Sequence, residues 1–368
     1  MSPGSDPFNA DLAEETLHVS SLDPGREDPA TTEARSALDS YRADSRRRAT
    51  QLRRTAEGYL TRGREDLYEM LMLGIEIEHL PSYLVRRLRN RMPIGTSFAA
   101  AMATTNGFVR AVKETDIAPY LAIVSKSVGR DLASRLGMRS ATLHQTNVAL
   151  DEVRFRPGTV VKPTDSSGAR GVLLCSVDGS LKTVRDGQSY DDSDGYIQAM
   201  RGGLSTGEIR KDRWQVEELL VGPDGGPAED LKFYAFYGSI PLTLHCRRLP
   251  RAQFCFYSDG EIVKTGKYED RSFPGPGVPA GWHRTVQDIS LRLPLPFVRI
   301  DVYNTADGLY FGEFTTVPGK YQKFNTHYDR LLGEEHVQAQ ARIFRDFLRG
   351  TSFTEFESLF GAGSAAGP

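Results

Sequence analysis

Apolar and polar residues alternate along two neighbouring stretches of the chain, residues 297–304 and 309–319. Such alternation is typical of β-strands, and the Asp-Gly pair between the two stretches is typical of a hairpin turn. We therefore predict a hairpin with a three-residue loop, Ala306–Gly308, in which Gly308 adopts a positive φ angle. This register sets Asp301 opposite Glu313.

The two faces of this hairpin differ in chemistry, because alternate side chains of a strand point to opposite sides. We expect Val298, Ile300, Val302 and Phe314 on a core face and Arg299, Asp301, Glu313 and Thr315 on the other. Two opposed carboxylates repel, and Mg²⁺ is typically held by one or two carboxylates together with substrate phosphates. An exposed face with a spare acidic pair explains the same residues, so the hairpin alone leaves both interpretations open.

The remaining pattern predicts helices in the first part of the chain and mostly strands after residue 155. Helical spacing is seen over residues 36–66 and 66–95, and residues 96–125 are expected to be helical in part. Strands are expected near 158–163, 171–177, 180–184, 215–220, 230–237 and 241–248, and later helices at 283–293, 334–349 and 353–360. Antiparallel hairpins between helical segments predict an α+β fold.

The composition is that of a globular protein from a reducing compartment. Of 368 residues, 39% are hydrophobic and 26% are charged, with a formal net charge of -2, so nothing suggests nucleic-acid binding. The three cysteines, Cys175, Cys246 and Cys255, have neither the number nor the spacing of a disulfide framework or a zinc site. No signal-peptide pattern and no long apolar run are present, so we expect a cytoplasmic protein without a membrane span.

Four segments are expected along the chain. Residues 1–35, rich in Ser, Asp, Glu, Pro and Gly, predict a disordered leader. Residues 36–150 would form a helical region with part of the acceptor site, 151–350 the core, and 351–368 a closing helix and a loose tail. The arginines of 36–66 favour a solvated helix face over a polyanion contact.

A loop of small residues, 164–171, follows the strand that contains Lys162. Backbone N–H groups of such a loop can surround phosphate oxygens, and a lysine adds a point charge. The loop is not a Walker motif, because no Gly-Lys-Ser/Thr closes it and no helix follows. Many hairpin loops contain the same residues, so this feature alone favours an ordinary loop.

Further polar positions have both a functional and an ordinary interpretation. The Glu217–Leu220 stretch is either a strand whose backbone meets a base edge or a half-buried strand. Asp230 and Lys232 share a strand face, as a solvated ion pair or as ribose and phosphate contacts. Arg247 and Arg248 end the next strand, where surface charge is common, and Lys126 precedes a helix, where a lysine usually faces solvent.

The order of these features resembles the ATP-grasp superfamily, and most closely its TupA-like group, named for teichuronopeptide synthesis. A lysine before a helix is followed by a strand with a second lysine, a glycine-containing loop, Glu-Glu-Leu-Leu, an acid, arginines, and an Arg-x-Asp…Gly-Glu hairpin. Residues 230–238, 297–303 and 311–319 carry the resemblance most strongly. It spans roughly residues 120–345, and the hairpin is its most specific part.

The resemblance implies an ATP-grasp fold, in which two α+β subdomains clamp ATP, and a role for each motif residue. Lys126 and Lys162 would hold phosphates beneath a lid that contains Ser166, Ser167, Gly168 and Gly171. Glu217, Glu218 and Leu220 would border adenine, and Asp230 would bind the ribose. Lys232, Arg247 or Arg248 would contact the γ-phosphate, and Arg299 the acyl phosphate. Asp301 and Glu313 would bind Mg²⁺ with Thr315, where many ATP-grasp ligases have Asn.

The implied activity is that of an ADP-forming carboxylate–amine ligase that makes an amide through an acyl phosphate. ATP and Mg²⁺ would be its cofactors, and an amino acid or small peptide-like molecule its substrate, in secondary metabolism or envelope-polymer modification. A kinase-like phosphotransferase and a non-catalytic ATP-binding scaffold are the alternatives. The expected partners are small-molecule carboxylates and amines, without nucleic acid, and a homodimer is left open.

Overall fold

A computed structural model describes residues 29–76, 79–88, 96–113, 123–164 and 168–359. The chain divides into two compact units, Met1–Gly95 and Thr96–Pro368. Within the described ranges, no helix combines the length and the apolar character needed to cross a membrane.

The described residues of the first unit form helices around a small core. Its helices are α1 (Pro29–Leu60), α2 (Glu65–Leu73) and α3 (Ser82–Leu88). Ala56, Met72 and Leu84 are among the side chains that fill the core. Two expectations from the sequence are not met in this unit. Helix α1 starts at Pro29, within the expected disordered leader, and residues 1–28 of that leader lie outside the described ranges. The single helix expected over 66–95 is split into α2 and α3.

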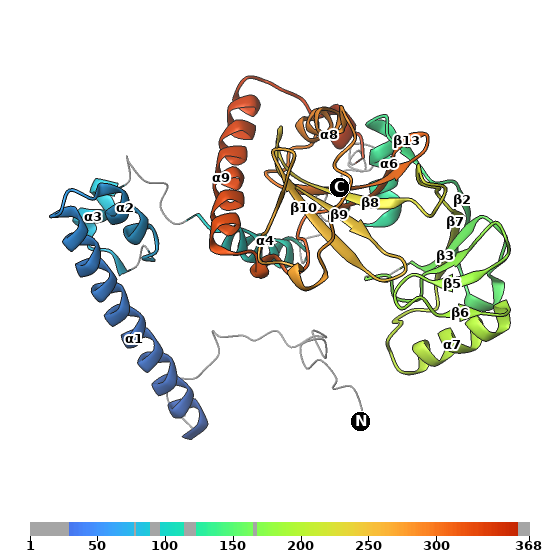
Figure 1. The fold of residues 1–368 in the computed structure, drawn as a ribbon, viewed down its shortest axis with the longest axis horizontal. Coiled ribbons are helices and arrows are strands. Elements are labelled where there is room, and N and C mark those ends of the chain that lie inside the picture. The colour runs from blue at the N-terminus through green and yellow to red at the C-terminus, as the bar shows by residue number, and fades with distance from the viewer. Residues whose placement is uncertain (1–28, 77–78, 89–95, 114–122, 165–167, 360–368) are drawn as a thin grey trace, which may run out of the picture. The chain divides into compact units, whose positions relative to one another are not determined.

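The second unit contains two sheets in its described residues (Figure 1). Sheet A has the strand order β1-β13-β12-β8-β9-β10-β11. Its strands are β1 (Arg139–Ser140), β8 (Glu229–Phe236), β9 (Ser239–Arg247), β10 (Gln253–Ser258), β11 (Glu261–Val263), β12 (Val298–Thr305) and β13 (Gly308–Thr315). Only the short β1–β13 pairing among these is parallel.

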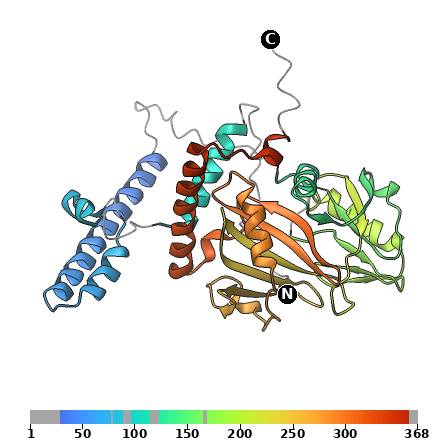
Figure 2. The same ribbon diagram turned by 90° about the horizontal axis from the view of Figure 1, so that it is seen from above.

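Sheet B has the order β2-β7-β3-β4-β5-β6. Its strands are β2 (Leu143–Val148), β3 (Thr159–Pro163), β4 (Leu173–Cys175), β5 (Leu181–Thr183), β6 (Ser189–Tyr190) and β7 (Trp214–Glu218). Together with α7 (Ser193–Ser205) it forms the green lobe beside sheet A, on the side away from α9, in both Figure 1 and Figure 2. The α+β prediction is confirmed.

The helices and short turns of the second unit frame these sheets. They are α4 (Phe98–Lys113), α6 (Lys126–Arg135), η3 (Leu150–Glu152), η4 (Glu269–Arg271), α8 (Trp282–Leu291), η5 (Tyr321–Lys323), α9 (Thr326–Leu348) and α10 (Thr354–Glu357). Helix α9 begins eight residues before the predicted start, because Asn325 caps it by accepting a hydrogen bond from the Tyr328 N–H at 3.0 Å.

The main core lies on sheet A and is built around aromatic rings. Phe98 of α4 makes edge-on contacts with Tyr234, Phe297 and Phe324 at centroid distances of 5.0 to 6.4 Å. Offset and edge-on pairs of this kind add stabilisation beyond the buried area alone. A second apolar cluster, which includes Val161, Tyr196 and Trp214, holds sheet B against α7.

The β12–β13 hairpin pairs Asp301 with Glu313 as predicted, but its turn differs from the predicted one. Thr305 pairs with Gly308, so the loop has two residues rather than three, although Gly308 has the predicted positive φ of 105°. A bulge at Gly312 then adds one residue to β13 and restores the pairing of Asp301 with Glu313. A Cβ at Gly312 would lie 3.1 Å from the Asp301 carbonyl oxygen, so the bulge favours glycine.

Gly333 of α9 offers a test of how the second unit begins. A Cβ at this position would lie 2.7 Å from the backbone of Thr96 and Ser97. We expect Gly333→Ala to lower the free energy of unfolding by about 1–3 kcal/mol in urea titrations, the usual cost of overpacking. Gly107→Ala is the control, since that helical glycine has no atom within 4 Å. It should be neutral or stabilise by up to about 1 kcal/mol, and equal losses would contradict the packing argument.

Candidate functional site

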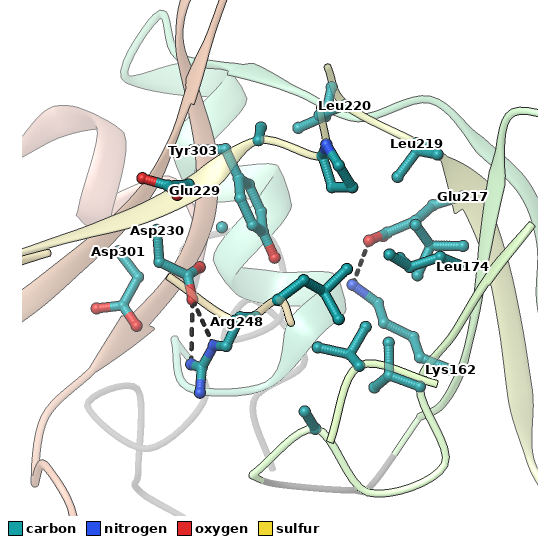
Figure 3. A pocket seen from close by; sticks show the side chains of 18 of the residues that line it. Lys162, Leu174, Glu217, Leu219, Leu220, Glu229, Asp230, Arg248, Asp301 and Tyr303 are labelled. Carbon is teal, nitrogen blue, oxygen red and sulfur yellow. Dashed lines mark hydrogen bonds and ion pairs between the residues drawn. The ribbon is translucent and has the colours of Figure 1, made fainter. Parts of the chain in front are cut away.

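A pocket of about 570 Å³ lies between the two sheets (Figure 3). Its volume falls in the range of small-molecule sites, about 300–1,000 Å³. Strands β3 and β7 supply one side, and β8, β12 and β13 supply the other. Predicted site residues that line it are Lys126, Lys162, Gly168, Glu217, Glu218, Leu220, Asp230, Lys232, Arg247, Arg248, Asp301 and Glu313.

Other predicted residues lie elsewhere. Arg299 and Thr315 are outside the lining and contact each other, with Arg299 Nη2 donating to Thr315 Oγ1 at 3.0 Å. Gly171 is also outside it, and its carbonyl accepts a hydrogen bond from the Tyr196 hydroxyl at 2.8 Å. Gly171 has a positive φ of 65° beneath tightly packed side chains, so its observed role is in loop packing. Ser166 and Ser167 lie outside the described residues.

Asp301 is the centre of a buried charge cluster. It lies directly opposite Lys232 on β8, and the two side chains form an ion pair. Arg299 adds hydrogen bonds from Nε and Nη2 to the two Asp301 oxygens, at 2.6 and 2.7 Å. Burial alone would raise the pKa of Asp301, but Arg299 and then Lys232 outweigh it and hold the pKa at about 2. The interpretation of Asp230 and Lys232 as a solvated pair is excluded, because both are buried.

Glu313 faces Asp301 across the hairpin and is more exposed, with 51% of its side chain accessible. Desolvation and then repulsion by Asp301 raise the pKa of Glu313. Given this exposure, we consider the repulsion the more important cause. A cation between the two carboxylates would relieve it.

The donor set fits Mg²⁺ bound together with phosphates rather than Mg²⁺ alone. No cluster of three or more His, Cys, Asp or Glu side chains with metal-binding geometry occurs among the described residues. Asp301 accepts three of the roughly four hydrogen bonds that a carboxylate can take, which leaves one position for a metal. Mg²⁺ commonly keeps one or two carboxylates and takes its other ligands from phosphates and water.

Two further ion pairs stand next to this cluster on sheet A. Arg248 binds Asp230, with both Nε and Nη2 about 3.0–3.1 Å from Oδ2. Arg247 Nε donates to Glu229 Oε1 at 2.6 Å, and the other Glu229 oxygen contacts His245 Nε2 at 2.6 Å. Attraction by Asp230 raises the pKa of Arg248, so this guanidinium stays charged.

The opposite wall, on sheet B, is organised around Glu217. Its carboxylate pairs with Lys162 and also accepts hydrogen bonds from Arg130 and Gln215, each at 3.1 Å. Figure 3 shows the Lys162–Glu217 pair facing the Arg248–Asp230 pair across the pocket, with the Tyr303 ring between them. Lys126 reaches the same wall and donates to the Pro163 carbonyl at 3.0 Å.

Most of the remaining lining is apolar and forms a slot next to the Glu217–Leu220 segment. The side chains that build it include Val160, Val172, Leu174, Val184, Leu219, Pro227 and Leu249. The Leu220 carbonyl accepts from the Ala228 N–H at 2.9 Å, and Glu218 N–H donates to the Thr142 carbonyl at 2.9 Å. A flat apolar group would therefore contact aliphatic side chains here, next to a backbone segment whose cited hydrogen bonds are made within the protein.

The sequence analysis overlooked Arg130, Tyr303 and Glu229, which also line the pocket. Arg130 lies one helical turn after Lys126, a spacing that places both side chains on one face. Tyr303 lies two residues after Asp301 on the same strand, so strand alternation had already placed it on the polar face. Of these three residues, only Glu229 lacked such a signal. It directly precedes Asp230 on β8, so strand alternation predicts its side chain on the face opposite to that of Asp230.

Comparison with known proteins gives one family match. The model of a family described as TupA-like ATPgrasp matches residues 110–337, more than half of the chain. None of the curated proteins matches the chain.

Three of the solved structures that resemble the chain do so at low identity. A D-alanine–D-alanine ligase from Bacillus anthracis is 14% identical with a TM-score of 0.37, over 61% of this chain and 69% of that one. The ATP-grasp ligase PsnB, bound to a precursor variant, Mg and ADP, is 12% identical with a TM-score of 0.36, over 60% and 59%. D-cycloserine synthetase DcsG is 17% identical with a TM-score of 0.38, over 68% and 82%. Likenesses at this level add nothing to the functional argument.

The depressed pKa of Asp301 predicts a specific acid sensitivity. Its folded pKa of about 2 lies below the ordinary value of 3.8, so its ionisation stabilises the fold above pH 4. This contribution, about 2–3 kcal/mol, is lost as the pH falls from about 4 to 2. The difference in unfolding free energy between wild type and Asp301→Asn should shrink over that interval. The exposed Asp288→Asn is the control for loss of a charge, and curves for Asp301→Asn that stay parallel to wild type would contradict the assignment.

Proposed function

Because the chain belongs to the TupA-like ATP-grasp family, we propose that it is an ATP- and Mg²⁺-dependent ligase that joins a carboxylate to an amine with release of ADP and phosphate. The observation that carries the proposal is the convergence of charged side chains on one pocket of small-molecule size: lysines from α6, sheet A and sheet B, and the facing acids Asp301 and Glu313 from sheet A.

The proposed nucleotide position follows from the chemistry of the walls. The apolar slot along Glu217–Leu220 suits adenine, and Glu217 would accept a hydrogen bond from its exocyclic amine. Asp230 suits the ribose hydroxyls. Lys126 and Lys162 lie on the sheet B side, where they can exchange their protein partners for phosphate oxygens. The terminal phosphate would then lie toward Asp301 and Glu313.

Mg²⁺ would be held by Asp301 and Glu313 and would neutralise charge on the phosphates during transfer. Lys232 and Arg299 hold the Asp301 carboxylate between them, so its orientation is fixed before a ligand arrives. Thr315 is engaged by Arg299, and we assign it a supporting role for that guanidinium rather than direct coordination.

The proposed reaction has two balanced steps. A substrate carboxylate oxygen attacks the γ-phosphorus, the bond to the bridging oxygen of ADP breaks, and an acyl phosphate forms. The amine nitrogen then attacks the acyl carbon, phosphate leaves with the bonding pair, and the nitrogen loses a proton to give the amide. Such transfers depend mainly on positioning and on stabilising spreading negative charge, which Lys232, Arg248 and Arg299 can do.

Substitution of the charge cluster tests the catalytic assignment. Purified protein is screened with Mg·ATP, single amino acids and hydroxylamine, which traps an activated carboxyl group, and phosphate release and hydroxamate are measured. With a substrate found in this way, Arg299→Ala and Asp301→Asn should each lower the rate by at least about 10²–10³, the usual effect of losing one charge-stabilising group. The exposed Arg349→Ala should keep full activity. Near-normal turnover in either site variant would remove the assignment.

Nucleotide binding provides a second test that needs no substrate. We expect Mg·ATP to raise the melting temperature of the wild type and to do so much less for Lys162→Met, whereas the exposed Lys323→Met should respond normally. Without Mg²⁺, a triphosphate would face two carboxylates directly. Glu313→Gln should then bind ATP in EDTA more tightly than wild type, because one repulsive charge is gone. A wild type that does not respond to Mg·ATP would overturn the proposed function.

A further inference from the structure

The polar face of sheet A continues beyond the nucleotide pocket. Lys232, Asp301 and Glu313 form one row across β8, β12 and β13, and all three line the pocket. The next row, Tyr234, Arg299 and Thr315, lies about 7 Å further along the strands and lines no part of it. Since the terminal phosphate is proposed to lie at the first row, the reacting substrate would lie over the second.

Tyr234 places a buried hydroxyl in this second row without a partner. The residue is fully buried, and among the described residues no group forms a hydrogen bond with its hydroxyl. Its side chain shares a sheet face with Arg299, directly opposite on β12. Buried hydroxyls are nearly always hydrogen-bonded, so one without a partner suggests a missing ligand group or water.

Lys267 provides a second incompletely satisfied donor in the same region. It is 3% exposed, and its ammonium donates to the Gly319 carbonyl at 2.8 Å. The ammonium lies 4.9 Å from the centroid of the Phe324 ring, which is 5.8 Å from the Tyr234 ring. No carboxylate among the described residues lies within ion-pair distance of it. Burial, followed by the charges of Arg299 and Lys320, lowers the pKa of Lys267 to about 7.

The loop that carries Lys267 is fixed in place. The Thr265 carbonyl accepts from the Asn325 N–H at 2.6 Å, and Glu269 Oε1 accepts from the Gly266 N–H at 2.8 Å. A Cβ at Gly266 would lie 2.9 Å from the Asn325 nitrogen, so only glycine allows this close approach. The lysine is therefore held beside the sheet by the backbone rather than by an acidic partner.

The rim of this region has two strained residues. Tyr268 and Lys320 have positive φ angles of 62° and 56°, and the Lys320 ammonium lies 5.6 Å from the Tyr268 ring centroid. Positive φ is costly for a bulky residue, and such positions tend to occur at functional sites. The Tyr268 ring also stacks on the Phe254 ring, with their centroids 4.2 Å apart, so aromatic rings form part of this rim.

From these observations we propose that Tyr234, Lys267 and Arg299, with Lys320 at the rim, form a subsite for a second anionic group of the acid substrate, a carboxylate or a phosphate. The inference rests on the proposed ligase function. Arg299 is already balanced by Asp301 and Glu313, whereas Lys267 and Lys320 have no acidic partner among the described residues. A substrate with one reacting carboxylate and one further acidic group would provide the missing charge.

Calorimetric titration of the full chain loaded with Mg·ADP tests the subsite. The probes are glutarate, 4-phosphonobutyrate and butyrate, which has one carboxylate and no second acidic group. We expect glutarate or 4-phosphonobutyrate to bind at least tenfold more tightly than butyrate, and the better of the two identifies the second group as a carboxylate or a phosphate. A wild type that binds both no better than butyrate overturns the proposal.

Two substitutions separate the subsite from a purely structural role. Lys267→Met should lose the tenfold preference over butyrate, while the exposed Lys264→Met keeps it. Tyr234→Phe should weaken binding of the preferred probe several-fold and should not lower the melting temperature of the ligand-free protein, because the hydroxyl that it removes has no partner. Unchanged probe affinity in both Lys267→Met and Tyr234→Phe also overturns the proposal.

The same titrations distinguish this inference from the proposed function. Affinity for Mg·ADP is measured first in each variant. Failure of the wild type to bind Mg·ADP would contradict the nucleotide site itself. Normal Mg·ADP binding with no preference for the doubly charged probes would remove only the second subsite.

Discussion

The structure of the site depends on one buried carboxylate, that of Asp301, which holds a lysine and an arginine from two neighbouring strands. Taking three charged groups out of water is costly unless each is paired and hydrogen-bonded. Here the antiparallel register places Lys232 directly opposite Asp301, and Arg299 reaches both carboxylate oxygens. The sheet thus fixes three charges in two adjacent rows. Lys232 and Asp301 lie in the row that lines the pocket, and Arg299 lies in the next row, toward the proposed substrate region.

Much of this arrangement could be predicted from the sequence, because it follows from strand alternation. The core face with Ile300 and the shared face of Asp230 and Lys232 depend only on the alternation of side chains within one strand. The shared face of Asp301 and Glu313 depends also on the register between the two strands. The loop length could not be predicted from alternation. The chain uses a two-residue turn where a three-residue loop was predicted, and a bulge at Gly312 restores the predicted strand register. The shorter turn and the bulge compensate for each other, so Asp301 still pairs with Glu313 as predicted. Phe311 lies in the core, where its ring centroid is 4.6 Å from that of Phe314.

Features that depend on distant parts of the chain could not be predicted. Nothing in the local sequence indicates that Arg130 reaches Glu217 across 87 residues, or that Lys267 lies beneath Phe324. Helix α7 was also missed, although Asp192 caps it by accepting from the Gly195 N–H at 2.9 Å. Its three glycines lower the helical propensity, and packing of Tyr196 in the sheet B core compensates for this.

The ion pairs across the pocket have a consequence for selectivity. Lys162, Arg248 and Lys232 each already have an acidic partner, so an incoming anion must replace contacts that the protein makes with itself. A small free anion gains little from that exchange and brings no surface to bury in the aliphatic slot. A molecule that combines negative charge with a flat aromatic system gains from both, so discrimination against the many simple anions of a cell is built into the resting pairs.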